Sequence, residues 1–146
     1  VAVEFVHPVI VGKRALPAIS LACDTATVTA VAARAGMTGI FAHQLRLLAE
    51  PADIALGISV EDDSASVLDG LRAAAGLGLL TIALTGQGGA GSADRGAGKV
   101  ADHVLAVGSA DPRVIKEIQV TAYPLLWELV HVFFEQPSVL SQGEAT

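Results

Sequence analysis

Two serines enclose three consecutive carboxylates in the segment Ser59-Val60-Glu61-Asp62-Asp63-Ser64. The segment follows an apolar run at residues 53–59 and precedes a stretch of helical period at residues 64–77. A loop that ends a strand and opens a helix can bind phosphate, because unpaired N–H groups, the helix dipole and hydroxyl groups point at the same spot. The carboxylates oppose such binding, since two unit charges about 4 Å apart repel by roughly 1 kcal/mol in water and by about 4 kcal/mol at an effective dielectric constant of about 20.

This acidic loop has two interpretations. In the first, Asp62 or Asp63 caps the following helix and Glu61 is solvated, because carboxylates at a helix N-terminus are favoured by the dipole. In the second, the loop suits another ligand, such as a cation, an amine-bearing sugar or a basic residue of a partner protein. Ser59 and Ser64 could still donate hydrogen bonds to a hydroxylated ligand.

Two other segments carry polar groups at the ends of apolar runs. Asp24 and Thr25 follow the run at residues 16–22, where they could cap a helix or contact a ligand. The glycine-rich stretch from Gly86 to Ser92 follows the run at residues 79–85. It could cradle a phosphate or simply connect two elements, and it does not fit the context of a nucleotide-binding fingerprint.

The pattern of apolar residues predicts an α/β fold. Short apolar runs bounded by turn residues predict buried strands at residues 16–22, 53–59, 79–85 and 102–107. Segments of helical period alternate with them, at residues 26–35, 40–50, 64–77 and 111–135. This alternation indicates right-handed crossovers and a Rossmann-like or flavodoxin-like parallel sheet flanked by helices. Ligands of such sheets bind beyond the carboxyl ends of the strands, where we expect the loops at residues 23–25, 59–64 and 85–92 to meet.

Composition limits the organisation and the partners of the chain. Its 146 residues, 52% of them hydrophobic, predict one domain at residues 1–136 and a polar tail at residues 137–146. The net charge of -6 argues against nucleic acid or an anionic membrane as a partner. A lone cysteine excludes internal disulfides, which favours the cytoplasm. No apolar run reaches the roughly 20 residues of a membrane span. The chain starts without Met inside a predicted helix, so we expect residues to precede Val1.

The strand, loop and helix at residues 53–68 resemble the phosphate-binding segment of the SIS (sugar isomerase) domain family, and of its phosphoheptose isomerases in particular. Four further segments are similar in order and spacing; they are Leu16-Pro17-Ala18-Ile19 with Asp24-Thr25, Ile40-Phe41-Ala42, Thr81 to Gly86, and Ala101-Asp102-His103-Val104. The resemblance implies the SIS fold, a sugar-phosphate ligand and a homo-oligomer, dimer or tetramer, with active sites at subunit boundaries. It also implies that the family's first helix, first strand and glycine-rich loop are absent from this chain.

The resemblance also identifies candidate catalytic residues. Aldose–ketose isomerisation needs a base and an acid that act on one sugar through an enediol. The family's catalytic Glu falls on Glu4, whereas its Gln-Glu-x-His pattern becomes Lys116-Glu117-Ile118-Gln119. Gln119 cannot exchange a proton near neutral pH, and Lys116 would need burial to act instead. Some family members hold zinc with His, Glu and Gln, and since two of these types are replaced here we predict no metal and no other cofactor.

Two functions remain open from the sequence. The first is a protein of the sedoheptulose 7-phosphate isomerase type, with Glu4 as base and Gln119 or Lys116 orienting the sugar together with Ser59, Ser64, Asp24 and Thr25. The second is a non-catalytic SIS module for binding, regulation or assembly, favoured by Gln119 and the acidic loop. The four histidines, His7, His43, His103 and His131, are predicted to be structural. The apolar stripe of the last helix, which includes Trp127, predicts core or subunit interface.

Overall fold

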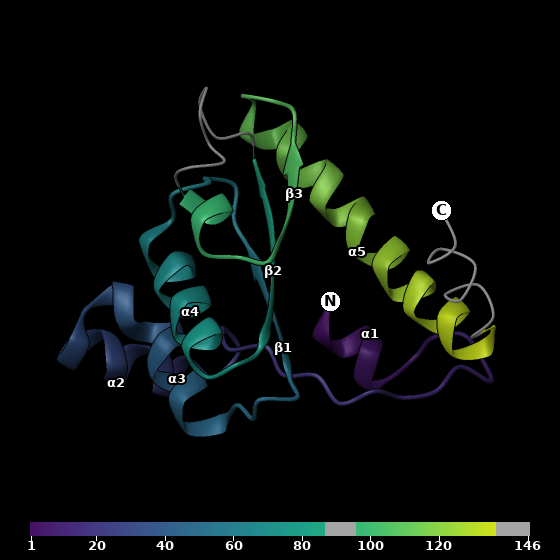
Figure 1. Cartoon of the computed structure of the whole chain (residues 1–146), viewed down its shortest axis with the longest axis horizontal. Helices are drawn as coiled ribbons and strands as arrows, with labels where there is room; N and C mark the ends of the chain where they lie inside the picture. Colours follow the sequence, from purple (N-terminus) through teal and green to yellow (C-terminus); the bar gives the residue numbers. More distant parts are fainter. Residues whose placement is uncertain (87–95, 137–146) are drawn as a thin grey trace. The chain divides into compact units, whose positions relative to one another are not determined.

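A computed structural model describes residues 1–86 and 96–136 of the chain (Figure 1). The helices, in chain order, are α1 (Ala2–Val6), α2 (Thr25–Ala35), η1 (Met37–Gly39), α3 (Ile40–Leu48), α4 (Ala65–Gly76), η3 (Gly96–Lys99) and α5 (Pro112–Glu135). The strands are β1 (Ile54–Ile58), β2 (Leu80–Gly86) and β3 (His103–Val107). Most of the glycine-rich stretch and the whole predicted tail lie outside the described residues.

The chain divides into two compact units, which are described separately. Unit 1 combines Val1–Ser20 with the chain from Val120 onward, and unit 2 is Leu21–Gln119. Helix α5 therefore contributes its first turns to unit 2 and its remainder to unit 1. The assignment of residues 1–136 to one domain stays a prediction.

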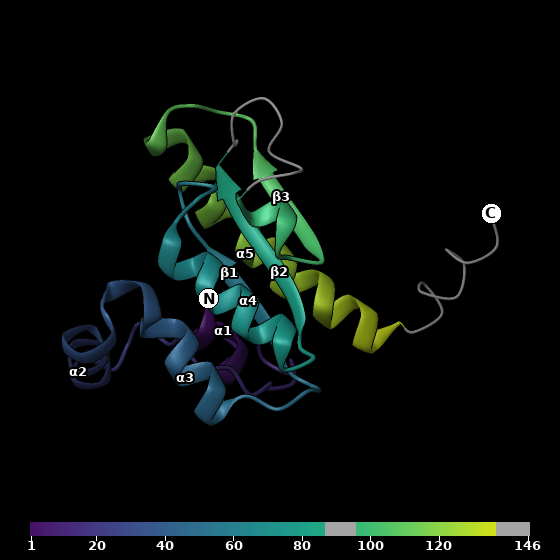
Figure 2. The same ribbon diagram turned by 60° about the vertical axis from the view of Figure 1, so that its left-hand side comes forward.

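Unit 2 is built on a parallel sheet with the order β1-β2-β3, so β2 lies in the middle (Figure 2). Its register pairs Ile54 with Leu80 in the first ladder and Ile82 with His103 in the second. Each strand is followed by a helical segment before the next strand begins, as βαβ units require. The predicted parallel α/β fold is confirmed, and three of the four predicted strands are present.

Helix α4 packs closely on β1 and β2 because glycine allows it to (Figure 1). A Cβ atom on Gly57 of β1 would lie 2.8 Å from Cγ1 of Val67. Helix α3 packs against the outer side of α4, where a Cβ on Gly70 would lie 3.1 Å from Cβ of Phe41. The buried side chains between α4 and the sheet are Leu68, Leu71, Ala83 and Ala97. Unit 2 is thus a layered α/β structure in which the β1–α4 connection is tightly packed.

The strand predicted at residues 16–22 is absent, and that prediction was wrong. No part of this segment pairs with β1, β2 or β3, and Ile19 is 74% exposed. The carbonyl of Leu21 accepts a hydrogen bond from the side chain of Gln44 instead, at 3.0 Å. A strand forms only when a neighbour supplies its ladder hydrogen bonds, and an apolar run of suitable length does not guarantee that neighbour.

The outer strands are less buried than the sequence predicts. In β2 all residues except Leu80 and Ile82 are buried, whereas β1 and β3 are edge strands with exposed apolar side chains. Ile54, for example, is 63% exposed. Ile54 and Ile58 alternate with Gly57, which faces α4, so they lie on the opposite face of the sheet.

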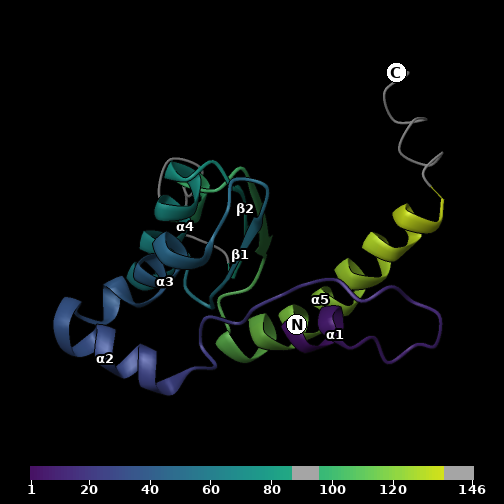
Figure 3. The same cartoon turned by 90° about the horizontal axis from the view of Figure 1, so that it is seen from below.

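Unit 1 contains the short helix α1, the segment that follows it, and most of α5. Figure 3 shows α1 beside α5 and the following segment looping out along the C-terminal half of α5. The backbone N–H of Leu16 returns to the carbonyl of Phe5 at 2.8 Å, which closes this loop. Helix α5 continues through Pro124 to Glu135, as predicted for the last helix.

No helix in the described ranges 1–86 and 96–136 is both long and apolar enough to span a bilayer.

A carboxylate at the start of β3 fastens that strand to β2, and its removal should destabilise the protein. Asp102 accepts hydrogen bonds from the hydroxyl and the backbone N–H of Thr81 at 2.7 and 2.8 Å, and the hydroxyl bond is the main cause of the lowered pKa of Asp102. A lowered carboxyl pKa stabilises the folded state at neutral pH, and this contribution is lost as the pH falls through the lowered value. We expect Asp102→Asn to lower the melting temperature at pH 7 and to have little effect in strong acid, measured by circular dichroism.

The matched control is Asp69→Asn in α4, which should shift the melting temperature little at either pH. An equal loss for Asp102→Asn at both pH values would contradict the assigned role of the charge.

Candidate functional site

The loop between β1 and α4 is fastened to neighbouring elements by backbone hydrogen bonds. The N–H of Ser59 donates to the carbonyl of Leu84, and that of Gly86 donates to the carbonyl of Val60, both at 3.1 Å. A Cβ atom on Gly86 would collide with this same carbonyl oxygen, so only glycine fits there. Backbone hydrogen bonds therefore join the carboxyl ends of β1 and β2 at the base of the loop that carries the serines and the acidic residues.

Gln119 completes this junction from α5. Its Nε2 donates one hydrogen bond to the carbonyl of Ser59 at 2.7 Å and another to the carbonyl of Leu84 at 3.1 Å. An amide nitrogen carries two hydrogens, so both are used, and only Oε1 remains to accept from a ligand. Gln119 is buried, and its partners belong to the main chain. Gln119, which stands where the resemblance places a catalytic His, thus links the loop after β1 to the end of β2. We call this pair of hydrogen bonds the Gln119 clamp.

The three carboxylates of the acidic loop do not behave alike. The backbone carbonyl of Asp62 and its Oδ1 both accept from the N–H of Ala97, at 3.1 and 3.2 Å. Gly96 has a φ of +55°, and a Cβ there would collide with the Asp62 side chain. Glu61 and Asp63 are exposed, and Glu61 is the acceptor of a long 3.5 Å hydrogen bond from the hydroxyl of Ser59. Asp62 is therefore a link to η3, and the other two contribute negative charge at the surface.

The prediction that Asp62 or Asp63 caps α4 was wrong. The N-cap is Ser64, whose side chain makes no capping hydrogen bond. One oxygen of Asp62 instead accepts from the N–H of Ala97, 35 residues further along the chain. Among residues 1–86 and 96–136, no side chain accepts from the first turn of α4, an arrangement that favours an anion.

Thr85 is a further polar group at this edge; it begins the loop at residues 85–92 that was expected to lie at the ligand site, but it was not itself one of the candidate site residues. It is the penultimate residue of β2 and is only 1% exposed. Its hydroxyl oxygen has no hydrogen-bond partner among the residues that the structure describes. Buried hydroxyls normally find a partner. Its place at the end of a predicted strand was the available signal.

Asp24 and Thr25 are not brought to this edge. Oδ1 of Asp24 accepts from the N–H groups of Ala26 and Thr27, and Oδ2 accepts from the hydroxyl of Thr27 at 2.6 Å. The Thr27 hydroxyl is the main cause of the lowered pKa of Asp24. Figures 1 and 2 show α2 far from the tip of β2 within unit 2. Since residues 16–22 form no strand, nothing carries Asp24 to the carboxyl edge, and the capping alternative is the one observed.

Lys116 and Glu4 occupy different surroundings. Lys116 is exposed on α5, one turn before Gln119. Glu4 lies in α1 of unit 1, where its Oε2 is buried 3.8 Å from the amino group of Val1 and has no hydrogen-bond partner among the residues that the structure describes. The backbone carbonyl of Glu4 accepts a hydrogen bond from Nε1 of Trp127 at 3.0 Å.

The residues present do not suit the zinc ion held by some proteins of the SIS type. Gln119 directs its amide nitrogen at two backbone carbonyls, and the neighbouring candidate position is the cation Lys116. Zinc prefers imidazole, thiolate and carboxylate ligands. Within residues 1–86 and 96–136, no three His, Cys, Asp or Glu side chains are grouped as metal ligands would be.

Comparison with known proteins identifies the family. The chain is 36% identical over 144 residues to a phosphoheptose isomerase of Desulfovibrio desulfuricans, covering 96% of this chain and 65% of that one. It is 35% identical over 140 residues to a phosphoheptose isomerase of Roseiflexus sp., covering 93% and 67%. The solved structure of a phosphoheptose isomerase from Francisella tularensis superposes with a TM-score of 0.77 at 29% identity, covering 89% of this chain and 67% of that one. No family model matches the chain.

The chain therefore belongs to the phosphoheptose isomerase family. It spans about two thirds of the length of the curated relatives it matches. The resemblance inferred from the loop at residues 59–64 is confirmed at the level of the family and the fold.

Removal of the Gln119 clamp should destabilise unit 2. Gln119→Leu leaves the carbonyls of Ser59 and Leu84 without this donor, and a buried unsatisfied group costs about 1–3 kcal/mol. We expect the free energy of unfolding in urea to fall by about 2 kcal/mol. Gln119→Glu should be at least as harmful at neutral pH, because a carboxylate oxygen would face two carbonyl oxygens, and should recover as acid protonates it.

Lys116→Gln, one turn earlier and exposed, is the control and should change the free energy of unfolding by less than about 0.5 kcal/mol. Wild-type stability for Gln119→Leu would show that the clamp is dispensable.

Proposed function

We propose that this protein binds a seven-carbon sugar phosphate such as sedoheptulose 7-phosphate and interconverts its aldose and ketose forms. The observation that carries the proposal is the uncapped N-terminus of α4 directly after β1, in a chain of the phosphoheptose isomerase family. Free N–H groups, the helix dipole and the hydroxyls of Ser59 and Ser64 suit a phosphate. The buried hydroxyl of Thr85 adds a polar group that a ligand could satisfy.

In this proposal Glu4 is the base. It removes the proton from the hydroxyl-bearing carbon next to the carbonyl, the electron pair forms the C=C bond of the enediol, and water protonates the former carbonyl oxygen. The protonated Glu4 carboxyl then delivers its proton to the former carbonyl carbon, while the hydroxyl on the first carbon loses its proton to water and becomes the new carbonyl. The unpartnered Oε2 of Glu4 supports this role, and Oε1 of Gln119 would orient a sugar hydroxyl as an acceptor. Lys116 remains a candidate for orienting the substrate.

The proposal extends to the state and location of the protein. Its proposed partner is a sugar phosphate. We further propose that two or four copies assemble with active sites at subunit boundaries, and that the protein is cytoplasmic. The exposed apolar side chains of the edge strand β1, Ile54 and Ile58, support burial against further protein.

A non-catalytic binding module is the second candidate, and one observation favours it. Gln119 stands at the position where the resemblance places a His, and both of its amide hydrogens are committed to the main chain. Such a residue neither donates nor receives a proton during turnover. Binding of the sugar phosphate without proton exchange would distinguish this candidate from the isomerase.

Proton abstraction can be measured separately from isomerisation. We expect the protein in D2O to incorporate deuterium next to the carbonyl of sedoheptulose 7-phosphate, detected by NMR, because this step requires the base alone. Glu4→Gln should abolish the incorporation, whereas Glu50→Gln on the surface should leave it unchanged. Binding without incorporation by the wild type would contradict the isomerase proposal in favour of the binding module.

The exposed carboxylates of the loop should weaken phosphate binding. We expect the double variant Glu61→Gln/Asp63→Asn to bind the sugar phosphate more tightly, by up to roughly thirtyfold, because each of the two charges contributes repulsion of about 1 kcal/mol in water at about 4 Å. The gain should shrink at high salt, as screened charges require. Asp53→Asn, at the other end of β1, is the control for calorimetric titration. Weaker binding by the double variant would show that these carboxylates contact the ligand favourably.

A further inference from the structure

The carbonyl of Glu4 lies in the last turn of α1, which ends at Val6, and has no partner within the helix. In an α-helix this carbonyl would accept from the N–H four residues later, but that residue is Pro8, which has none. The indole Nε1 of Trp127 takes its place at 3.0 Å. Trp127 is the sole tryptophan of the chain and is buried.

Helix α1 depends on such outside contacts. It has five residues and no side-chain hydrogen bond at its N-cap. Isolated helices this short are unstable in water, because nucleation is not repaid by enough internal hydrogen bonds. Within the described part of the chain, Oε2 of Glu4 has no hydrogen-bond partner and lies 3.8 Å from the amino group of Val1, so the place of this carboxylate depends mainly on where the backbone of α1 is held.

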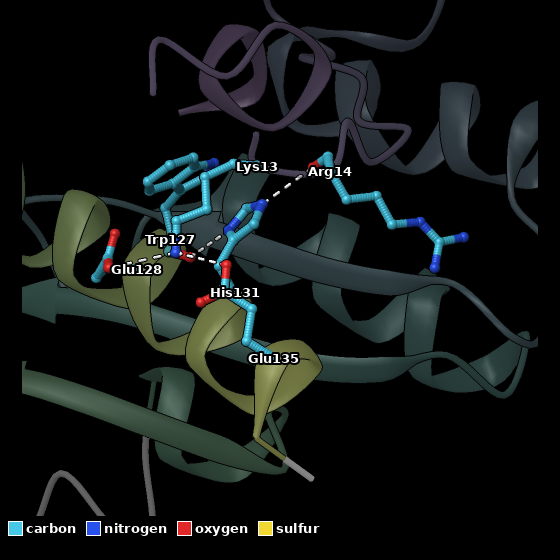
Figure 4. Close-up of polar contacts among 6 residues, drawn as sticks. All are labelled: Lys13, Arg14, Trp127, Glu128, His131 and Glu135. Atoms are coloured by element: carbon cyan, nitrogen blue, oxygen red, sulfur yellow. Dashed lines mark hydrogen bonds and ion pairs between the residues drawn. The ribbon is translucent and has the colours of Figure 1, made fainter. Parts of the chain in front are cut away.

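Trp127 is itself held by His131. The two ring centroids lie 4.2 Å apart with an interplanar angle of 41°. His131 is 1% exposed, and its Nδ1 lies 2.8 Å from the carbonyl of Trp127 while its Nε2 lies 3.0 Å from the carbonyl of Arg14 (Figure 4). Either neutral tautomer donates to one of these carbonyls, and the doubly protonated ring donates to both.

The charged groups around His131 strengthen the same attachment. Lys13 forms ion pairs with Glu135 at 2.8 Å and with Glu128 at 3.6 Å, both on α5 (Figure 4). The guanidinium of Arg14 lies 5.7 Å from the ring centre of Phe134. The segment at residues 13–14 is thus fixed to the C-terminal half of α5 on both sides of the His131 contact.

From these contacts we propose that Trp127 is a positioning residue for Glu4, with His131 holding Trp127 in place. The inference rests on the proposed role of Glu4 as base. The indole N–H replaces the donor that Pro8 lacks and so fixes the backbone from which the Glu4 carboxylate projects. Loss of the N–H should reduce proton abstraction more than substrate binding, because a displacement of about 1 Å at a catalytic group can cost roughly a hundredfold in rate.

The test compares Trp127→Phe with a variant that restores a donor by another route. Trp127→Phe keeps an aromatic ring and removes the N–H. We expect deuterium incorporation into sedoheptulose 7-phosphate at saturation to fall roughly tenfold to a hundredfold, with the half-saturating concentration nearly unchanged. Adding Pro8→Ala allows α1 to extend past His7, so that the N–H of residue 8 can donate to the Glu4 carbonyl, and should recover most of the rate. Arg46→Met, exposed on α3 of unit 2, is the control and should leave the rate unchanged.

An unchanged rate in Trp127→Phe, or a lost rate that Pro8→Ala does not recover, would overturn the proposal, because loss of packing alone would not be rescued by a backbone donor. Amide hydrogen exchange in α1 is measured on the same variants without substrate. Protection lost in Trp127→Phe and regained in the double variant supports the positioning contact, even if the wild type shows no proton exchange and the proposed function fails. Unchanged protection overturns it whatever the activity.

Discussion

The carbonyl groups at the carboxyl ends of two parallel strands must be satisfied, and in this protein Gln119 satisfies two of them. Its amide nitrogen joins the carbonyls of Ser59 and Leu84, while the N–H of Ser59 donates to that same Leu84 carbonyl. The loop before α4 is built on this junction. Because buried backbone groups without partners are costly, the position cannot readily serve a second purpose. In this protein a structural requirement occupies the place where the resemblance puts a proton carrier.

The acidic loop shows the same division between structure and function. Asp62 connects the loop to η3, and none of the side chains that the structure describes accepts a hydrogen bond from the first turn of α4. Glu61 and Asp63 remain exposed and add negative charge to a site that otherwise suits an anion. The affinity for a phosphate then depends on whether the N–H and hydroxyl donors of the loop outweigh the repulsion by the two carboxylates. Ionic strength changes this affinity, because salt screens the repulsion.

Local sequence patterns predicted most of the fold. The runs that became β1, β2 and β3 are bounded by turn residues and separated by clear helical periods, so their type could be inferred without knowledge of their neighbours. The run at residues 16–22 has the same local character but no partner strand, and pairing is a non-local property. Sequence alone could not reveal which apolar run would remain unpaired.

The site was less predictable than the fold for the same reason. Gln119 binds a carbonyl 60 residues away, and Asp62 binds an N–H 35 residues away. Contacts over such separations leave no periodic pattern in the sequence. Local reasoning therefore interpreted Asp62 as a helix cap and Gln119 as a substitution of a catalytic residue. The hydrogen bond from Trp127 to the carbonyl of Glu4 is similarly non-local, although a proline just after a short helix indicates a carbonyl that needs another donor.

The central claim is that a sugar phosphate binds at the N-terminus of α4 despite the acidic loop. A titration of the isotope-labelled protein with sedoheptulose 7-phosphate, followed by backbone amide NMR, tests it directly. We expect saturable shifts that are largest in the first turn of α4 and in Ser59. Saturable shifts confined to other parts of the chain, or none at all, would contradict it.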